Sequence, residues 1–407
     1  MSTTTERLDP KTIETVKATV PVLAEHGTAI TSTFYQLLFT NHPELKNIFN
    51  QTNQKKGKQP QALANAVYAA AANIDQLETI LPVVKQIAHK HRSLNIKPEH
   101  YPIVGENLLK AMQVVLKEAA TEEIIAAWAK AYGVIADVFI QVEEGMYQET
   151  ETAPGGWIGY RPFRIVEKVK ESDVITSFYL KPDDNKSLPE YEAGQYVTVK
   201  VSVPGIPYTC QRQYSLSCKP NQDVWRISVK KEAALENHPD GVVSSFLHHH
   251  INENDVIELS APAGDFVLNQ EAKPLVLVSG GVGLTPLVSM LETVVEQQPQ
   301  RDVYFIHAAQ NERLHGLQDI VKDITNNHPH VRAFTVYEKP EHTALCDKSG
   351  YIDLPWLQSV VPTNEASFYF CGPEPFMKAI NQALTTWEVH PADIHFEFFG
   401  PKGDLEA

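Results

Sequence analysis

The sequence predicts a multidomain protein in which an all-α domain, an antiparallel β-barrel and an α/β doubly wound domain follow one another. At 407 residues the chain is too long for one ordinary hydrophobic core. The spacing of its apolar residues also changes twice, near Gly155 and again after Pro274. We therefore expect three domains, over residues 1–150, 155–266 and 273–407.

The composition excludes several classes of protein. There are 35 basic and 50 acidic residues, a net charge of −15, and the basic residues form no block that could follow a phosphate backbone. The N-terminal ten residues are polar, and no run of 18 apolar residues occurs. The four cysteines form no Cys-x-x-Cys pair. We expect a cytoplasmic protein with no nucleic-acid partner, no disulfide framework and no obligate membrane contact.

Helical spacing dominates the first 150 residues, and one helix is the most informative. We expect a helix from Thr79 to Leu94. Within it, the apolar residues Ile80, Val84 and Ile87 recur at intervals of four and three, and His91 continues this series. The imidazole therefore lies on the apolar face. A histidine in such a stripe is more often a core residue than a metal ligand, so the spacing alone leaves both interpretations open.

A second row of residues could face this histidine. Gln59, Leu63 and Val67 fall on one side of another predicted helix, where they would line a haem pocket. The segment Phe34-Tyr35, followed by residues 41–49, resembles the globin core of the flavohaemoglobins. The resemblance extends over about residues 8–402 and implies that His91 is the proximal ligand of a haem b iron.

The resemblance also implies roles on the distal side of the haem. Phe49 resembles the phenylalanine that packs against the haem. Tyr35, Gln59 and Leu63 resemble the residues over bound dioxygen, where a buried tyrosine hydroxyl finds a partner. Without the resemblance, Tyr35 is equally well a core tyrosine that donates to a backbone carbonyl.

On the proximal side, Tyr101 and Glu143 resemble the residues that hydrogen-bond around the ligand histidine in this family. A histidine that donates to a carboxylate pushes electron density onto iron, which favours oxygen activation over storage. The alternative is an interhelical contact for Tyr101 and a solvated position for Glu143. Lys90, beside His91, would tune the haem potential.

Short β-branched runs broken by proline and glycine fill residues 155–266, as expected of a small barrel. Within them, Arg212-Gln213-Tyr214-Ser215 resembles the Arg-x-Tyr-Ser motif that binds FAD in ferredoxin-reductase-like barrels. The guanidinium would bind the pyrophosphate, the phenol would stack on the isoalloxazine and the hydroxyl would reach the N5 edge. Four residues alone also fit an ordinary strand.

Three further segments support the flavin interpretation. Tyr196 lies one strand earlier, and Gly241 opens a helix whose first amides suit a phosphate. The tail resembles the segment that covers the flavin in this family. Its residues are Glu397, Phe398, Phe399, Gly400 and Pro401.

The last domain carries a glycine turn between a strand and a helix. The strand Leu275–Val278 runs into residues 279–286, where the backbone can approach a pyrophosphate at a helix N-terminus. The predicted contacts are Gly281, Val282, Gly283, Leu284, Thr285 and Pro286. We expect Pro286 at the first position of the helix, which suits proline.

A later strand ends in Cys371-Gly372-Pro373, which resembles the family's motif beside the nicotinamide. Its place at the carboxyl edge of the sheet favours a role in hydride geometry, although a strand-end cysteine is often structural. After the strand at residues 303–306 there is no arginine cluster or acidic residue that decides between NADH and NADPH.

The resemblance implies a nitric oxide dioxygenase with dioxygen and nitric oxide as substrates. NAD(P)H would reduce FAD, FAD would pass electrons to the haem, and iron-bound dioxygen would convert nitric oxide to nitrate. The same pocket and electron path would serve reduction of alkyl or lipid hydroperoxides, or of nitric oxide without oxygen. Oxygen storage or sensing is a third interpretation, which leaves the reductase half unexplained. We expect a monomer.

Overall fold

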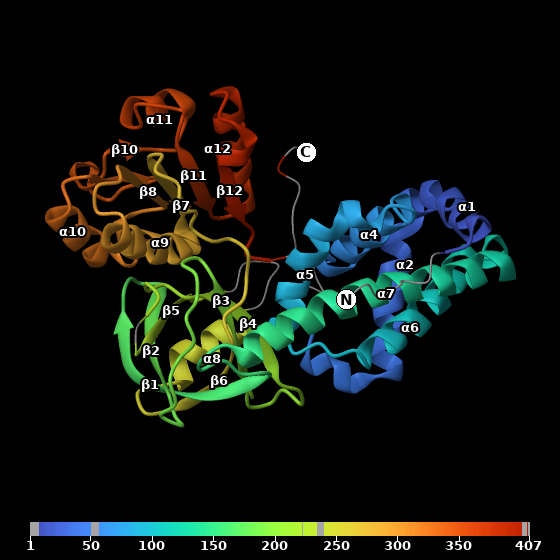
Figure 1. Ribbon diagram of the computed structural model, residues 1–407. Helices are drawn as coiled ribbons and strands as arrows, with labels where there is room; N and C mark the ends of the chain where they lie inside the picture. The colour runs from blue at the N-terminus through green and yellow to red at the C-terminus, as the bar shows by residue number, and fades with distance from the viewer. Residues whose placement is uncertain (1–7, 50–56, 222, 234–239, 401–404, 406–407) are drawn as a thin grey trace. The chain divides into compact units, whose positions relative to one another are not determined.

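The computed structural model describes residues 8–49, 57–221, 223–233, 240–400 and 405. The chain separates into two compact units, one helical and formed mainly by residues up to Ala153, the other containing two β-sheets (Figure 1). The segment Pro204–Gln211 belongs to the helical unit. Within the described ranges, no helix is both long enough and apolar enough to cross a membrane. The predicted order of an all-α, an antiparallel β and a parallel α/β part is confirmed.

The helical unit contains the segments α1 Pro10–Ala18, α2 Val20–Asn41, η1 Pro43–Asn47, α4 Lys58–Ala72, η2 Leu77–Ile80, α5 Leu81–Ser93, α6 His100–Leu116, η3 Lys117–Ala119 and α7 Glu122–Thr152. Helix α1 begins where Asp9 accepts a hydrogen bond from the amide of Thr12 at 2.9 Å. Such a cap satisfies an amide that has no acceptor within the helix. The helix expected from Thr79 begins instead at Leu81, because Pro82 favours the first turn of a helix.

The core of this unit lies where α2 packs against α4 and α6. Phe34, Leu38 and Trp128 are almost wholly buried there. The indole of Trp128 donates to the Thr19 hydroxyl at 3.1 Å, so its polar atom is satisfied inside the core. This packing fixes α2, which carries Tyr35, relative to its neighbours.

The first sheet of the second unit is antiparallel, with the order β4-β3-β6-β1-β2-β5. Its strands are β1 Tyr160–Lys170, β2 Ile175–Pro182, β3 Tyr196–Val201, β4 Cys210–Ser215, β5 Trp225–Lys230 and β6 Val256–Ser260, with helix α8 Val242–His250 between the last two. An antiparallel bridge between Leu216, just after β4, and Ile227 in β5 joins the two ends of the sheet. The sheet therefore nearly closes into the predicted barrel.

The second sheet is parallel, with the order β10-β9-β8-β7-β11-β12. Its strands are β7 Leu275–Gly280, β8 Val303–Ala309, β9 Val331–Tyr337, β10 Lys348–Ser349, β11 Ser367–Cys371 and β12 Ile394–Glu397. The connecting segments are η4 Gly281–Gly283, α9 Leu284–Gln297, η5 Glu312–Leu314, α10 Gln318–Asn327, η6 Thr343–Leu345, α11 Leu354–Val360, α12 Glu374–Thr386 and η7 Pro391–Asp393. The prediction missed the short edge strands β10 and β12.

Both faces of this sheet are buried. In β7, Leu275 and Leu277 belong to one core cluster, whereas Val276 and Val278 belong to another on the opposite face. The strand order reverses between β7 and β11. In open α/β sheets such a reversal places a ligand-binding crevice at the carboxyl ends of the two strands.

Candidate active site

Three predicted residues meet beside helix α5. Nδ1 of His91 lies 2.7 Å from Oε1 of Glu143, a residue of α7 that is only 3% exposed. The Tyr101 hydroxyl, from α6, donates to the same oxygen at 2.6 Å. The structure therefore brings together residues that are 10 and 52 positions apart from His91 in the chain.

This geometry fixes the chemistry of the imidazole. A buried carboxylate next to Nδ1 favours the tautomer in which Nδ1–H donates, and Nε2 is then the nitrogen that presents its lone pair to a metal. Burial and the neighbouring Glu143 carboxylate raise the pKa of the Tyr101 hydroxyl, so this group remains a proton donor. Glu143 is buried and does not occupy the solvated position of the alternative interpretation, whereas the hydrogen bond of Tyr101 is itself a contact between α6 and α7.

Phe139 is a neighbour of this group that the sequence prediction missed. Its ring centroid lies 6.0 Å from that of His91 and 6.4 Å from that of Tyr101. Phe139 precedes Glu143 by four residues on α7, so both face the same side of the helix. That spacing is a signal from which it could have been found. Its ring lies beside the imidazole that Glu143 orients.

The distal residues form an aromatic cluster. Tyr35 of α2 is 7% exposed, and its ring packs edge-on against Phe49 at a centroid distance of 5.6 Å. Phe39 contacts both rings, at 5.9 Å and 5.5 Å. Phe49 and Leu63 belong to the same hydrophobic cluster as Tyr35. The structure thus brings three of the predicted haem-pocket residues into one core.

The remaining two predicted pocket residues lie on two different helices, α4 and α5. Gln59 is half-buried at the start of α4, one turn before Leu63. Lys90 is half-buried on α5, next to His91. Their positions are compatible with the predicted roles, which remain predictions.

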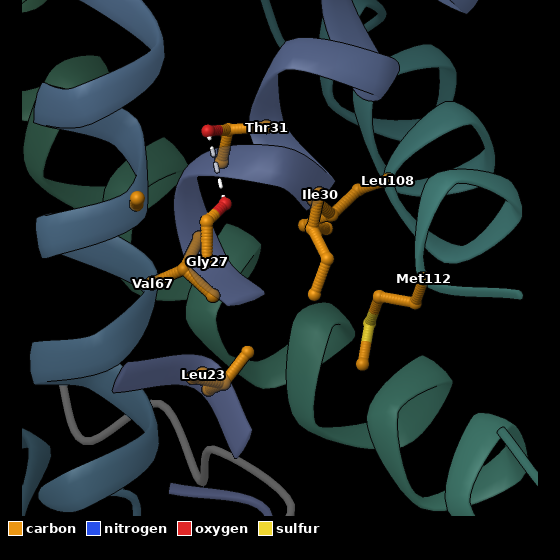
Figure 2. A pocket seen from close by; sticks show the side chains of 8 residues that line it. Leu23, Gly27, Ile30, Thr31, Val67, Leu108 and Met112 are labelled. Atoms are coloured by element: carbon orange, nitrogen blue, oxygen red, sulfur yellow. Dashed lines mark hydrogen bonds between the residues drawn. The ribbon is translucent and has the colours of Figure 1, made fainter. Parts of the chain in front are cut away.

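A small internal cavity lies along the same helices (Figure 2). Its lining residues come from α2, α4 and α6: Leu23, Gly27, Ile30, Thr31, Ala64, Val67, Leu108 and Met112. The Thr31 hydroxyl is the polar group in the lining, and it donates to backbone carbonyls of Pro60 at 2.8 Å and Gly27 at 3.1 Å. The cavity wall is therefore apolar, and Thr31 and Tyr35 lie one turn apart on α2.

The predicted flavin motif forms strand β4. Arg212, Gln213 and Tyr214 are half-buried there, whereas Ser215 is 6% exposed. Burial raises the pKa of the Tyr214 hydroxyl. Tyr196 begins β3, the neighbour of β4 in the sheet.

The packing around Tyr196 requires a glycine. A β-carbon on Gly264 would lie 3.0 Å from the Tyr196 ring, and the φ of Gly264 is +115°. Residues with a side chain rarely adopt that backbone conformation. The backbone at position 264 can therefore lie this close to the Tyr196 ring only because the residue is a glycine. Tyr196 is thereby held beside the flavin motif.

The predicted nucleotide motif forms the turn between β7 and α9. A β-carbon on Gly283 would lie 2.1 Å from the carbonyl oxygen of Cys371, so the turn touches the end of β11 directly. Gly281 has a φ of +54°. Pro286 is the third residue of α9, not the first as predicted, because the glycines form a separate short helical turn, η4. Proline is tolerated there because first-turn amides have no acceptor within the helix.

Cys371 and the predicted tail segment are brought together at the carboxyl edge of the sheet. Cys371 pairs with Glu397 across β11 and β12, and its thiol is wholly buried. Burial, together with the Glu397 carboxylate, raises the pKa of the Cys371 thiol. Phe399 is 49% exposed and Gly400 follows it. Pro401 lies outside the described residues.

The comparisons with known proteins agree with this arrangement. Three family models match in series: Globin over residues 32–139, Oxidoreductase FAD-binding domain over 162–268 and Oxidoreductase NAD-binding domain over 277–382. The flavohemoprotein of Oceanobacillus iheyensis is 57% identical over 402 residues, which cover 98% of each chain. The chain belongs to the flavohemoprotein family. The flavohemoprotein of Bacillus cereus is 56% identical over 98% of this chain and 100% of its own.

Solved structures extend the flavohemoprotein comparison. The flavohemoglobin of Malassezia yamatoensis, solved with bound FAD and haem, covers 97% of this chain with a TM-score of 0.83 at 24% identity, which shows a shared fold. The FAD- and NAD-binding part of a nitric oxide dioxygenase from Vibrio cholerae is 33% identical, covers 59% of this chain and 99% of its own, and has a TM-score of 0.55. The resemblance to the flavohaemoglobins is thereby confirmed.

The described residues of this flavohemoprotein fit the cofactors of its family. The carboxylate on Nδ1 of His91 leaves Nε2 for a haem iron. The half-buried Arg212 and Tyr214 supply a cation and an aromatic ring on one strand for a dinucleotide flavin. The glycine turn before α9 leaves its backbone open to a pyrophosphate.

Proposed function

We propose that this flavohemoprotein is an NAD(P)H-dependent nitric oxide dioxygenase that holds one haem b through His91 and one FAD at strand β4. When bound, FAD accepts a hydride and passes on single electrons, and haem supplies the oxygen chemistry. The observation that carries the proposal is the buried Glu143 carboxylate, which accepts hydrogen bonds from both His91 and Tyr101. A relative in Vibrio cholerae is a nitric oxide dioxygenase.

The chain's own residues have distinct tasks in this mechanism. Glu143 orients His91 and increases its basicity, which favours activation of dioxygen over its reversible storage. Tyr101 holds the carboxylate in place through its 2.6 Å hydrogen bond. Tyr35 and Gln59 would offer polar groups to dioxygen in the haem pocket, whereas Phe49 and Leu63 would keep the pocket apolar.

The reductase residues position the electron donors. Arg212 would neutralise the flavin pyrophosphate, Tyr214 and Tyr196 would stack against the ring system, and Ser215 would reach its N5 edge. Gln213 is held by the Thr198 hydroxyl at 3.4 Å. The turn Gly281–Gly283 would bind the nucleotide pyrophosphate, and Cys371-Gly372-Pro373 would border the nicotinamide. We further propose that the protein acts as a cytoplasmic monomer.

The test is an aerobic assay of the haem- and FAD-loaded protein, with a His91→Ala variant beside it. On addition of nitric oxide, we expect rapid NAD(P)H consumption and two nitrate ions for each NAD(P)H oxidised, because two nitric oxide and two dioxygen molecules share its two electrons. His91→Ala should abolish nitrate formation while flavin content stays normal. The proposal fails if nitric oxide does not stimulate the fully loaded protein. Hydroperoxide reduction or oxygen sensing would then be favoured.

A further inference from the structure

Helix α9 serves both halves of the reductase. It begins at Leu284, directly after the glycine turn that we assign to the nucleotide pyrophosphate. It is buried on nearly all sides, since every residue from Leu284 to Leu291 is buried. Side chains of α9 also hydrogen-bond to the barrel, at Arg226 of β5 and at the segment that follows β4.

Glu292 of α9 makes the central contact. Its Oε1 accepts a hydrogen bond from Arg226 of β5 at 2.8 Å, and its Oε2 accepts one from the backbone amide of Lys219 at 2.8 Å. The side chains of Arg226 and Glu292 are only 6% and 17% exposed. Both oxygens of one carboxylate are thus used to hold barrel residues.

The segment that is held follows the flavin motif directly. Ser217, Cys218 and Lys219 come two to four residues after Ser215. Arg226 donates to the Ser217 hydroxyl at 3.2 Å and also to the Ser217 carbonyl. The Cys218 carbonyl accepts from Ser289 of α9 at 2.5 Å.

A second barrel residue completes the arrangement. The Tyr191 hydroxyl donates to the same Cys218 carbonyl at 2.6 Å. We call the set Tyr191, Cys218, Arg226, Ser289 and Glu292 the α9 clamp. It fixes the three-residue segment from the barrel and from α9 at once.

We propose that Glu292 and Arg226 are positioning residues for hydride transfer, because the α9 clamp sets the distance between the nicotinamide and the flavin. The inference rests on the NAD(P)H-to-FAD step of the proposed function and not on the haem substrate. Glu292 lies eight residues after Leu284, about 12 Å along a helix at 1.5 Å per residue. One stiff element therefore joins the nucleotide turn to the end of the flavin strand.

A purely stabilising role would explain the clamp less well. A buried ion pair contributes little net stability, since desolvation offsets most of the attraction, so stabilisation alone does not account for the clamp. Hydride transfer depends steeply on geometry: reacting atoms must approach to about 3–3.5 Å, and a misplacement of about 1 Å can cost about a hundredfold in rate. A clamp that holds both sites is suited to that demand.

The test compares three variants of the haem- and FAD-loaded protein. Glu292→Ala removes both contacts, and Glu292→Gln keeps one carbonyl oxygen as an acceptor. Glu296→Ala is the matched control, because it removes the same charge one turn further along α9, where the exposed Glu296 pairs with the half-buried Lys219 ammonium at 2.7 Å. Anaerobic stopped-flow with NADH gives the limiting rate of flavin reduction, the apparent NADH Kd and the isotope effect of NADH deuterated at the transferred hydrogen.

We expect Glu292→Ala to lower the limiting rate by about tenfold to a hundredfold and Glu292→Gln by less, with an undiminished isotope effect. NADH affinity, flavin content and electron transfer from chemically reduced flavin to haem should stay close to wild type, as should every property of Glu296→Ala. A flavin-loaded Glu292→Ala protein with a wild-type limiting rate would overturn the proposal. If that variant loses its flavin, a wild-type rate in Glu292→Gln overturns it equally, and a slowed rate with full flavin supports it.

Discussion

The replacement Glu143→Gln changes one atom at the proximal site and tests the electronic role of the carboxylate. The amide has nearly the same shape, but it has no charge, and only one of its two polar atoms can accept a hydrogen bond. Oε1 of Glu143 now accepts at 2.7 Å from His91 and at 2.6 Å from Tyr101, in a position that is 3% exposed. His91 would therefore lose its anionic partner while keeping its place in the helix.

The expected size of the effect follows from these contacts. A hydrogen bond to a charged group contributes about 1.5–3 kcal/mol. Loss of a carboxylate that supports a ligand histidine typically costs about tenfold to a hundredfold in activity or metal affinity, which is about 1.4–2.8 kcal/mol. The two ranges agree, so we expect turnover with nitric oxide to fall by about tenfold to a hundredfold.

The assay measures turnover and, by spectroscopy, the strength of the bond between His91 and the haem iron. In resonance Raman spectra of the ferrous protein, the iron–histidine stretch should move to lower frequency, because a neutral imidazole donates less strongly than a partly anionic one. The haem reduction potential should rise, since a nearby negative charge is lost. Glu144→Gln is the matched control, because Glu144 is the adjacent residue of α7 and is exposed. A haem-loaded Glu143→Gln protein with wild-type stretch and turnover would show that the Glu143 charge does not act on His91.

Three further predictions concern other parts of the chain. Gly283→Ala should abolish NAD(P)H-dependent flavin reduction and leave haem and flavin content intact, because the added carbon would lie 2.1 Å from the Cys371 carbonyl oxygen; stopped-flow with normal rates would contradict this. Trp128→Phe should lower the free energy of unfolding by about 1–3 kcal/mol, measured by denaturant titration, since it leaves a gap and breaks the bond to Thr19. Burial lowers the pKa of His315 from 6.5 to about 4, so below pH 6.5 the unfolded chain binds a proton that the folded chain does not, and stability should fall as the pH drops from about 6.5 to about 4. His315→Gln should make the denaturant midpoint depend less steeply on pH over that window. An unchanged pH dependence would contradict the assignment.

The parts of the fold that could be predicted are those in which local pattern and tertiary structure agree. The alternation in β3 and the apolar runs of β7, β8, β9 and β11 each gave a strand at the expected place. Helical spacing placed His91 correctly on α5, although the first turn differed because Pro82 starts the helix later. Edge strands such as β10, with two residues, carry too little pattern to be seen in a sequence.

The features that could not be predicted depend on contacts between distant segments. Nothing near Glu143 in the sequence shows that it meets His91, and only the family resemblance suggested it. The bridge between Leu216 and Ile227 closes the barrel through one pair of residues, which leaves no periodic signal. Glu292 is one acidic residue among many, and its role becomes visible only when α9 packs against the barrel.

In a nitric oxide dioxygenase, both atoms of dioxygen are transferred to nitric oxide, and we propose that this occurs at the His91 site. The most direct measurement supplies the loaded, NADH-driven protein with heavy-isotope-labelled dioxygen and unlabelled nitric oxide, and analyses the nitrate by mass spectrometry. We expect two labelled oxygen atoms in each nitrate ion. Nitrate with one labelled atom or none, or a product other than nitrate, would contradict the proposal.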